Sequence, residues 1–462
     1  MSTLNENKRK LTSIRGMGAA LVGFAGWIIL YVVFGLIEPN IFTTNNMLNL
    51  LRSMAKYLLV GVGQSVILIT GNIDLSIGSV VAMSAMISAT MMSKGVAAII
   101  AILAAIVCCL AVGVINGVLV GKFKLPPFIA TLGTMFCARG VAYMANGNRN
   151  TDAIVSGLGK EAGDAFQNFF YYGKFLGIYN AFWIAFVIFL AVFFIMSKTR
   201  TGRHIYAIGS NVDAAKLSGV NVFTTTTKAY LISAFCSAVV GLILAGQAGM
   251  GNMEAGNCYE MYGVAAGVIG GISPLGGSGL LLGAFAGAGV WQTLENGLGI
   301  IGAPVGIQRI VIGVIVAGAV LGDVVFRQGT QKAKKEFVNF AGNPRKKLGG
   351  TNMKKALSIL LCLAMLMSLM AGCSSGTKPA EANSSETYKV ALITMDSIDQ
   401  HWITLKEGAE KAAAELGVDL TFMAPNTKDD ALQIEQVNNA VSAGNKAIIV
   451  AANGPDAISS AL

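Results

Sequence analysis

The sequence predicts an all-α polytopic membrane protein with about ten transmembrane helices, followed by a partial α/β segment of βαβαβ order. Composition leads to the first part of this prediction. Hydrophobic residues make up 54% of the 462 residues and 56 more residues are Gly, while charged residues make up only 13%. An ordinary soluble domain has about 25% charged residues, so a soluble core cannot use this much apolar surface.

Ten apolar stretches are candidate spans, because a helix needs about 18 or more apolar residues to cross a hydrocarbon layer of about 30 Å. They lie at residues 18–37, 56–70, 75–92, 96–120, 128–145, 181–196, 228–247, 262–272, 279–294 and 306–325. Several of them are short or contain Gly, so the predicted number of spans is approximate.

Positive charge between the stretches indicates the orientation of the chain. The net charge of +10 is concentrated in short clusters beside the apolar runs, as the positive-inside rule expects of cytoplasmic loops. An alternation that starts with a cytoplasmic amino terminus puts most clusters inside, with Arg52, Arg149 and Lys160 as exceptions. We therefore interpret the charge as membrane topology and expect contact with membrane lipid, and none with nucleic acid.

Residue types that carry catalysis or bind metals are sparse. The chain has two His, and its seven Cys are scattered without paired metal-ligand spacing. No glycine-rich stretch is followed by the Lys-Ser or Lys-Thr of a nucleotide-binding loop. We expect no enzyme activity, no metal and no cofactor in this chain, so any use of ATP requires a separate protein.

Two polar, Gly-containing breaks interrupt the apolar runs. The first, residues 71–78, contains Asn72, Asp74 and Ser76. Irregular backbone at membrane depth needs protein or water to satisfy its polar groups. Asp74 fits either of two roles: an N-cap for the next span or part of a polar translocation path. The second break, residues 270–279, is expected to reverse the chain between two short spans.

The loop around residues 199–220 is the longest on the inner side. It has room for a short helix lying parallel to the membrane, which a soluble partner can push. Asp213 is expected to cap this helix and Gly219 to end it. The alternative is an inert basic loop that faces acidic lipid.

Four motifs carry a family resemblance. They are Gly-Asn-Ile-Asp-Leu-Ser-Ile-Gly-Ser at 71–79, Thr-Arg-Thr-Gly-Arg-His-Ile-Tyr-Ala-Ile-Gly-Ser-Asn at 199–211, Ala-Ala-Lys-Leu-Ser-Gly-Val at 214–220 and Gly-Gly-Ile-Ser-Pro-Leu-Gly-Gly-Ser-Gly at 270–279. In this order they resemble the ribose and xylose type permeases of ATP-binding-cassette importers, within the branched-chain amino acid and monosaccharide permease family. The resemblance extends over residues 1–327.

The resemblance implies a permease subunit for a simple sugar in the bacterial plasma membrane. It implies three protein partners: a cytoplasmic ATPase that uses the ATP, a second permease copy and a complete extracytoplasmic sugar-binding protein. It also implies that the inner loop docks on the ATPase, through Gly202, Arg203, Asp213, Ala214, Ala215 and Gly219. Asp213 stands where the family commonly has Glu.

The carboxyl portion changes character. Residues 328–352 are typical of a cytoplasmic tail or linker, and residues 353–373 have the positive, apolar and small-residue parts of a secretory signal peptide. The end of this segment resembles a bacterial lipobox, in which Cys373 is lipidated; the alternative is an uncut eleventh span. Both place the flexible tether 374–387 and all that follows outside the cell. We interpret the pattern at Met353 as the start of a second coding unit joined to the first.

Strand and helix patterns alternate over residues 388–462. Strands are expected at 388–395, 418–423 and 447–451, and helices at 400–416 and 429–443. Ligands bind at the carboxyl ends of strands in such sheets, which nominates Asp396, Gln400 and Trp402. Trp402 fits either a stacking contact with a sugar ring or the core of the first helix. The segment resembles the first half-lobe of a periplasmic sugar-binding protein.

Two other functions are alternatives. One is a secondary transporter driven by an ion gradient, although such proteins place ionisable residues deep in their spans and this chain has almost none there. The other is a membrane-anchored receptor whose outer domain senses a ligand.

Overall fold

The computed structural model describes residues 2–304, 306–308, 310–311, 313–315, 317–318, 388–395, 400–425 and 429–459. Met1–Val316 and Tyr388–Leu462 form one compact unit, and a second unit, Ala317–Thr387, lies almost entirely outside the described residues. The predictions for the tail, the signal peptide with Cys373 and the tether therefore fall outside the described residues.

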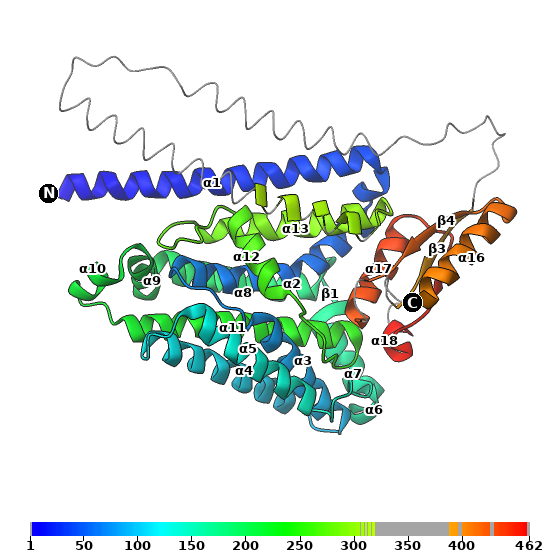
Figure 1. Ribbon diagram of the computed structural model, residues 1–462, viewed down its shortest axis with the longest axis horizontal. Coiled ribbons are helices and arrows are strands. Elements are labelled where there is room, and N and C mark those ends of the chain that lie inside the picture. Colours follow the sequence, from blue (N-terminus) through cyan, green and yellow to red (C-terminus); the bar gives the residue numbers. More distant parts are fainter. Residues whose placement is uncertain are drawn as a thin grey trace, which may run out of the picture. The chain divides into compact units, whose positions relative to one another are not determined.

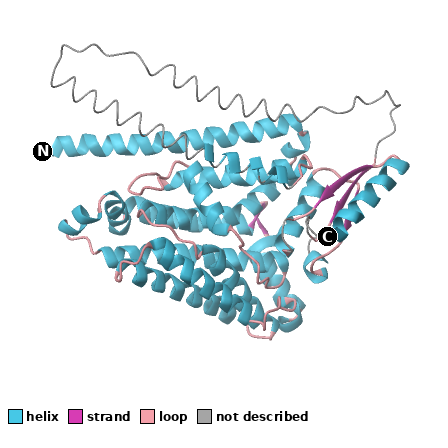
Figure 2. Ribbon diagram, viewed as in Figure 1, coloured by secondary structure: helices cyan, strands magenta, loops and turns pink. Residues whose placement is uncertain are grey.

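Helices make up most of the membrane portion, and strands form a short hairpin there and a sheet in the carboxyl segment (Figure 2). The elements of the membrane portion are α1 (Ser2–Ile37), η1 (Pro39–Phe42), α2 (Thr44–Ile69), α3 (Ile77–Ser93), α4 (Ala98–Gly121), α5 (Pro127–Met144), α6 (Ile154–Leu158), α7 (Lys160–Gln167), η2 (Asn168–Tyr172), β1 (Lys174–Phe175), β2 (Ile178–Tyr179), α8 (Asn180–Lys198), α9 (Arg200–Ser210), α10 (Val212–Leu217), α11 (Val222–Ala248), α12 (Tyr259–Ile269) and α13 (Leu281–Ile300).

Each of the first nine predicted spans overlaps a helix, and the tenth runs beyond the described residues. In the part of the chain that the structure describes, four segments are long and apolar enough to cross a membrane by themselves: Ala20–Ile37, Ala98–Gly121, Asn180–Lys198 and Val222–Ala248. These helices differ in burial. In the most apolar stretch of α11, 83% of the residues are buried in the protein, and in that of α4 only 22% are. We infer that α11 lies inside the bundle and that α4 faces lipid along one side, where Ile99, Leu103 and Val107 are exposed.

The helix α2 forms the centre of the bundle, packed against α8, α11, α12 and α13 (Figure 1). It begins at Thr44, well before the predicted start at Lys56. Apolar counting missed this first part because it contains polar residues that the protein buries, among them Asn46 and Arg52. Thr43 accepts a hydrogen bond from the amide of Asn46 and so caps the helix at its true start.

Small residues allow α4 to approach α11 closely. Gly113, Gly117 and Gly121 recur every four residues and share one face of α4. A Cβ at Gly117 would lie 2.6 Å from the Cα of Thr227 on α11, so any side chain there would force the helices apart. Helices in a membrane gain little from burying apolar surface, and close backbone packing of this kind is a main source of their association.

The helices α3 and α12 are both preceded by irregular backbone. Residues 70–76 lead into α3, and residues 249–258 lead into α12. The starts of the two helices touch, since a Cβ at Gly78 would overlap the carbonyl oxygen of Gly256. The reversal predicted at residues 270–279 is also present, between α12 and α13. Gly276 and Gly277 have φ angles of +85° and +67° there, which glycine adopts without steric cost.

The carboxyl segment has the predicted βαβαβ order. Its elements are β3 (Lys389–Ile393), α16 (Gln400–Leu416), β4 (Asp419–Met423), α17 (Asp430–Ser442), β5 (Ala447–Val450) and a short α18 (Pro455–Ser459). The strands are parallel in the order β4-β3-β5, with Val390 paired to Leu420 on one side and Ala447 on the other. Ala391 and Ile393 on the sheet and Ile434 on α17 are almost fully buried and form its core.

Candidate functional site

The inner loop folds into two short helices, α9 and α10, between α8 and α11. Thr199 caps α9 and accepts a hydrogen bond from the amide of Gly202 at 3.5 Å. Ile205 and Ile208 are buried on one face of α9, while Arg203 is exposed on another. The helix is thus amphipathic, with its apolar side held against the bundle and a basic residue left outside.

Backbone contacts join α9 to the adjacent ends of the central helices. The hydroxyl of Tyr206 donates a 2.8 Å hydrogen bond to the carbonyl oxygen of Gly279, in the turn between α12 and α13. A Cβ at Gly209 would overlap the carbonyl oxygen of Ile69, the last residue of α2. The amide of Gly277 in turn donates to that same carbonyl oxygen at 2.9 Å. Any displacement of α9 therefore acts directly on the end of α2 and on the 270–279 turn.

Burial raises the pKa of Tyr206 to about 12. The phenol therefore keeps its proton near neutral pH and remains a hydrogen-bond donor. Tyr206 was not among the residues predicted from the sequence, although it lies inside the motif at 199–211. Its partner Gly279 is distant in sequence, so nothing in the local pattern identified the contact.

The cap predicted for α10 at Asp213 is wrong. Asn211 is the N-cap and accepts a hydrogen bond from the amide of Ala214 at 2.9 Å, while Asp213 lies in the first helical turn. Asp213 is exposed, and its Oδ1 lies 3.8 Å from Nζ of Lys216. Because both side chains are in contact with solvent, this ion pair contributes little to stability. Asn211, two residues before Asp213, occupies the N-cap position, and Asn is as good a capping residue as Asp.

Gly219 ends α10, as predicted. Its φ angle is +82°, in the left-handed region, and the amides of Gly219 and Val220 bond back to Lys216 and Ala215. This is the arrangement by which glycine terminates helices. No atom lies within 4 Å of the position that a Cβ would take, so only the backbone angle demands glycine.

The six residues nominated for docking divide into two groups. Gly202 and Ala215 are buried and serve packing, while Arg203, Asp213, Ala214 and Gly219 are exposed. Leu217 at the end of α10 is 92% exposed, and Val212 is partly exposed beside it. Exposed apolar side chains on a protruding helix are typical of a protein contact. Leu217 was not among the predicted docking residues, although an apolar residue at the end of a polar loop is a signal that the sequence contains.

Asp74 lies in a buried polar network near the start of α3. Its Oδ1 accepts hydrogen bonds from the amide and the hydroxyl of Ser76, at 3.0 Å and 2.6 Å, and its Oδ2 accepts from the hydroxyl of Ser233 on α11 at 2.8 Å. Asn116 on α4 donates to Ser76 and accepts from Thr134 on α5. The network connects four helices at the first break.

The N-cap interpretation of Asp74 needs correction, because Ser76 occupies the N-cap position of α3. Asp74 instead stabilises the turn before the helix and anchors it to α11. Asn72 does not join this network; its amide donates to the hydroxyl of Thr70 at 2.9 Å. Of the three residues nominated at this break, the structure thus brings Asp74 and Ser76 together.

The exception that Arg52 posed to the charge rule has a structural explanation. Arg52 is almost fully buried, and its guanidinium carbon lies 4.6 Å and 4.2 Å from the ring centres of Tyr171 and Tyr179. Its Nη2 also donates to Asn49 at 2.9 Å. The charge is compensated inside the protein by aromatic faces and an amide. A count of exposed loop charges therefore should not include it.

The nominated sugar contacts are only partly described. Asp396 lies outside the described residues, and Gln400 is the first residue of α16. Trp402 is half-buried on the same helix. Its position at the carboxyl side of β3 is the one that the predicted topology requires. Within the described residues, no group of three His, Cys, Asp or Glu side chains could hold a metal ion.

The structure has the features of a polytopic membrane transport protein. Apolar helices expose apolar side chains along one side, irregular backbone precedes two of the helices, and a protruding loop contacts the ends of the central helices. The chain belongs to the family described as "Branched-chain amino acid transport system / permease component", whose family model matches residues 46–320, more than half of its length. A second family model, "Periplasmic binding protein domain", matches residues 390–462. The fusion that the sequence predicted, permease followed by binding-protein segment, is thus supported by two separate matches.

Individual relatives cover the permease portion. The chain is 34% identical to the ribose import permease protein RbsC of Escherichia coli (strain K12) over 296 residues, which is 64% of this chain and 91% of that protein. It is 35% identical to RbsC of Bacillus subtilis (strain 168) over 319 residues, 69% of this chain and 97% of that protein. It is 28% identical to the autoinducer 2 import system permease protein LsrC of Salmonella typhi over 319 residues, 69% of this chain and 89% of that protein. No solved structure matches the chain.

Proposed function

We propose that this chain is the permease subunit of an ATP-binding-cassette importer for a simple sugar of the ribose and xylose class. It resides in the bacterial plasma membrane with a cytoplasmic amino terminus, pairs with a second copy of itself and contacts membrane lipid. It performs no bond chemistry. A separate cytoplasmic ATPase binds and hydrolyses the ATP, and a complete extracytoplasmic binding protein delivers the sugar.

The observation that carries this proposal is the contact between α9 and the ends of the central helices. Tyr206 donates to Gly279 and Gly209 touches Ile69, so a push on the loop reaches α2 and the 270–279 turn without an intermediate. The exposed face of α9 and α10 offers Arg203, Asp213, Ala214 and Leu217 to a partner. The names of the relatives, which are permeases for ribose and autoinducer 2 import, support a small sugar as cargo.

Substitution at Gly219 tests the coupling role. Gly219→Leu puts a side chain on left-handed backbone, which costs roughly 1–2 kcal/mol, and alters the end of α10. Uptake of radiolabelled ribose or xylose by cells that also express a partner ATPase should fall at least tenfold, with membrane insertion unchanged. The matched control is Gly177→Leu, since Gly177 has a φ angle of +80° and equally open space but lies in the β1–β2 hairpin.

Normal uptake by Gly219→Leu would remove the coupling role from α10. Two further measurements distinguish the alternative functions. Uptake driven by an ion gradient in proteoliposomes without ATPase would favour a secondary transporter. Ligand binding without any uptake, in the presence of the ATPase and ATP, would favour a membrane-anchored receptor.

A further inference from the structure

The carboxyl segment contacts the permease through a buried ion pair. The Nζ of Lys56 on α2 lies 2.6 Å from Oε2 of Glu435 on α17, and the two side chains are only 3% and 6% exposed. Gln292 on α13 donates to the other carboxylate oxygen of Glu435 at 3.2 Å. Removing a charge of this kind from water is costly unless a partner of opposite charge meets it, so each of the two residues requires the other.

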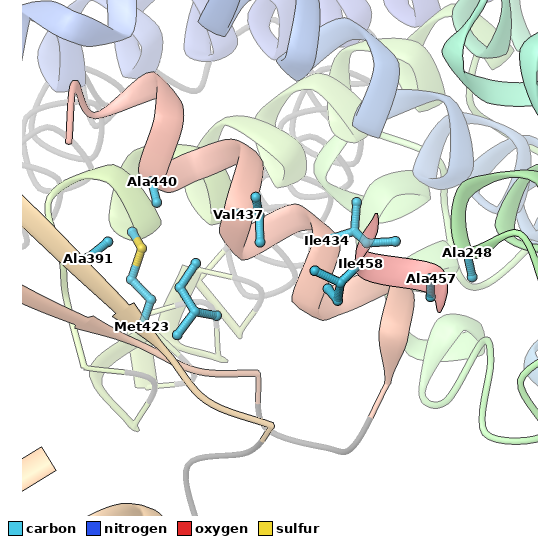
Figure 3. Packing of buried hydrophobic residues seen from close by; sticks show 9 residues of the cluster. Ala248, Ala391, Met423, Ile434, Val437, Ala440, Ala457 and Ile458 are labelled. Carbon is cyan, nitrogen blue, oxygen red and sulfur yellow. The ribbon is translucent and has the colours of Figure 1, made fainter. Parts of the chain in front are cut away.

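The helix α17 has two different faces, and both are buried. Ile434, Val437 and Ala440 pack on the sheet, in the cluster that Figure 3 shows. Glu435, Asn439 and Ser442 follow one another at helical spacing on another face and are also almost fully buried. In a domain of this kind standing alone, a polar helical face points to water. Here that face is covered by the permease.

Between the described residues, six side-chain hydrogen bonds across this contact share one direction, with the donor on the permease and the acceptor on the segment. The donor–acceptor pairs are Asn40 with the carbonyl oxygen of Ala443, Asn49 with Ser442, Lys56 with Glu435, Gln247 with the carbonyl oxygen of Ala431, Gln292 with Glu435 and Asn296 with Asn439. The permease thus presents a surface of donors around one cation, and it fits a helix that carries oxygen acceptors and one carboxylate.

The donors come from elements that meet at one end of the bundle: η1, the first half of α2 and the last parts of α11 and α13. The contacts of α9 lie at the opposite end of α2, at Ile69. In the topology given by a cytoplasmic amino terminus, the donor surface is extracytoplasmic. This is the side from which a binding protein approaches.

We propose that this donor surface is the docking site for a binding-protein lobe, with Lys56 as the anchor for a carboxylate on a helix, and that the chain's own segment occupies the site through Glu435. The inference rests on the proposed function, since it gives the permease an extracytoplasmic partner. In the uncut chain, the attached segment has an effective concentration on the order of millimolar, so it resists displacement by a free lobe with similar contacts. The segment therefore restrains the permease in a docked state.

Cross-linking in membranes of cells expressing the full chain tests the docking without relying on transport. In the Asn296→Cys/Asn439→Cys variant, a short bis-maleimide should join the two positions, and mass spectrometry of the linked peptides separates this product from links to native Cys. The control pair is Asn296→Cys/Glu415→Cys, because Glu415 lies exposed on α16. A yield no higher than in the control pair overturns the proposal.

Charge reversal then tests the anchor. In the cross-linking background, Lys56→Glu and Glu435→Lys should each lower the linked fraction at least tenfold, and the double reversal Lys56→Glu/Glu435→Lys should restore most of it. Lys56→Met, which removes the charge but keeps an unbranched side chain, should lower the yield as well, and recovery in the double reversal shows that the loss does not come from misfolding. Unchanged yields in all three single variants overturn the role of Lys56. Loss of uptake with normal cross-linking would instead bear on the proposed function alone.

Discussion

The hydroxyl of Ser233 on α11 lies 2.8 Å from Oδ2 of Asp74, and through this bond the backbone before α3 is fixed to the most buried of the long apolar helices. Asp74 is 2% exposed and also accepts two hydrogen bonds from Ser76. A carboxylate in such a position is tolerated because its acceptors are satisfied. The break before α3 is therefore a fixed piece of structure.

Asp74→Ala should destabilise the protein, because it leaves the hydroxyls of Ser76 and Ser233 without their acceptor. Each unsatisfied buried polar group costs about 1–3 kcal/mol. The melting temperature of the detergent-solubilised protein should fall clearly, and Asp74→Asn, which keeps one acceptor oxygen, should cause a smaller loss. The control is Asp152→Ala, at an exposed carboxylate. Equal melting temperatures for Asp74→Ala and its control would contradict the network's structural role.

Tyr206→Phe should weaken coupling while leaving the fold intact. It removes only the hydroxyl that bonds to Gly279, and a neutral hydrogen bond contributes about 0.5–1.5 kcal/mol. Sugar uptake per ATP hydrolysed should drop severalfold in proteoliposomes containing the ATPase. Tyr31→Phe is the matched control, since Tyr31 also donates to a carbonyl oxygen, that of Ile41, but at the other end of the bundle. A similar drop in both variants would mean that the effect is not specific to α9.

Gly117→Leu should disrupt the packing of α4 on α11, because a side chain there would overlap Thr227. Overpacking of this kind costs about 1–3 kcal/mol. The fraction of monodisperse protein in size-exclusion chromatography should fall. Gly133→Leu on α5 introduces the same side chain where no atom lies within 4 Å, and it should behave like the unmodified protein. If the two variants behave alike, close approach at Gly117 is not what holds the two helices together.

Acidic pH should strengthen the fold of the carboxyl segment around α17. Burial raises the pKa of Asp429 to about 6, and the neighbouring charge of Asp430 acts in the same direction, while Lys56 opposes both. The folded state therefore prefers protonated Asp429, so stability is gained as pH falls from 6 toward 4 and is lost as pH rises through 6.

Hydrogen exchange of the α17 amides, corrected for the intrinsic pH dependence, measures this effect. Protection should be greater at pH 5 than at pH 7.5. Asp429→Asn should flatten the difference while keeping the cap, because its side-chain oxygen can still accept from the amides of Ala431 and Leu432, as Asp429 does. A pH difference of the same size in Asp429→Asn would exclude Asp429 as its source.

The sequence predicted most elements because their signals are local. In the carboxyl segment, the helix expected at 400–416 has those bounds in the structure, and the strands agree to within a few residues. The start of α2 was missed because burial of Asn46 and Arg52 depends on distant segments. The same reason hid the role of Lys56, whose partner Glu435 is separated from it by 379 positions. Hydropathy cannot separate a polar residue at a membrane boundary from one that the fold later encloses.

The enclosure of Arg52 by Tyr171 and Tyr179 has a consequence for the order of events during biosynthesis. When α2 leaves the ribosome, neither tyrosine has been synthesised, so the guanidinium is unshielded and, in a chain with the proposed cytoplasmic amino terminus, favours the opposite orientation. The effect of the basic cluster Lys8, Arg9 and Lys10 on orientation must therefore exceed that of Arg52 until η2 and the β1–β2 hairpin have been synthesised. The orientation of insertion is therefore set by residues that are already in the translocon, and Tyr171 and Tyr179 can enclose Arg52 only afterwards.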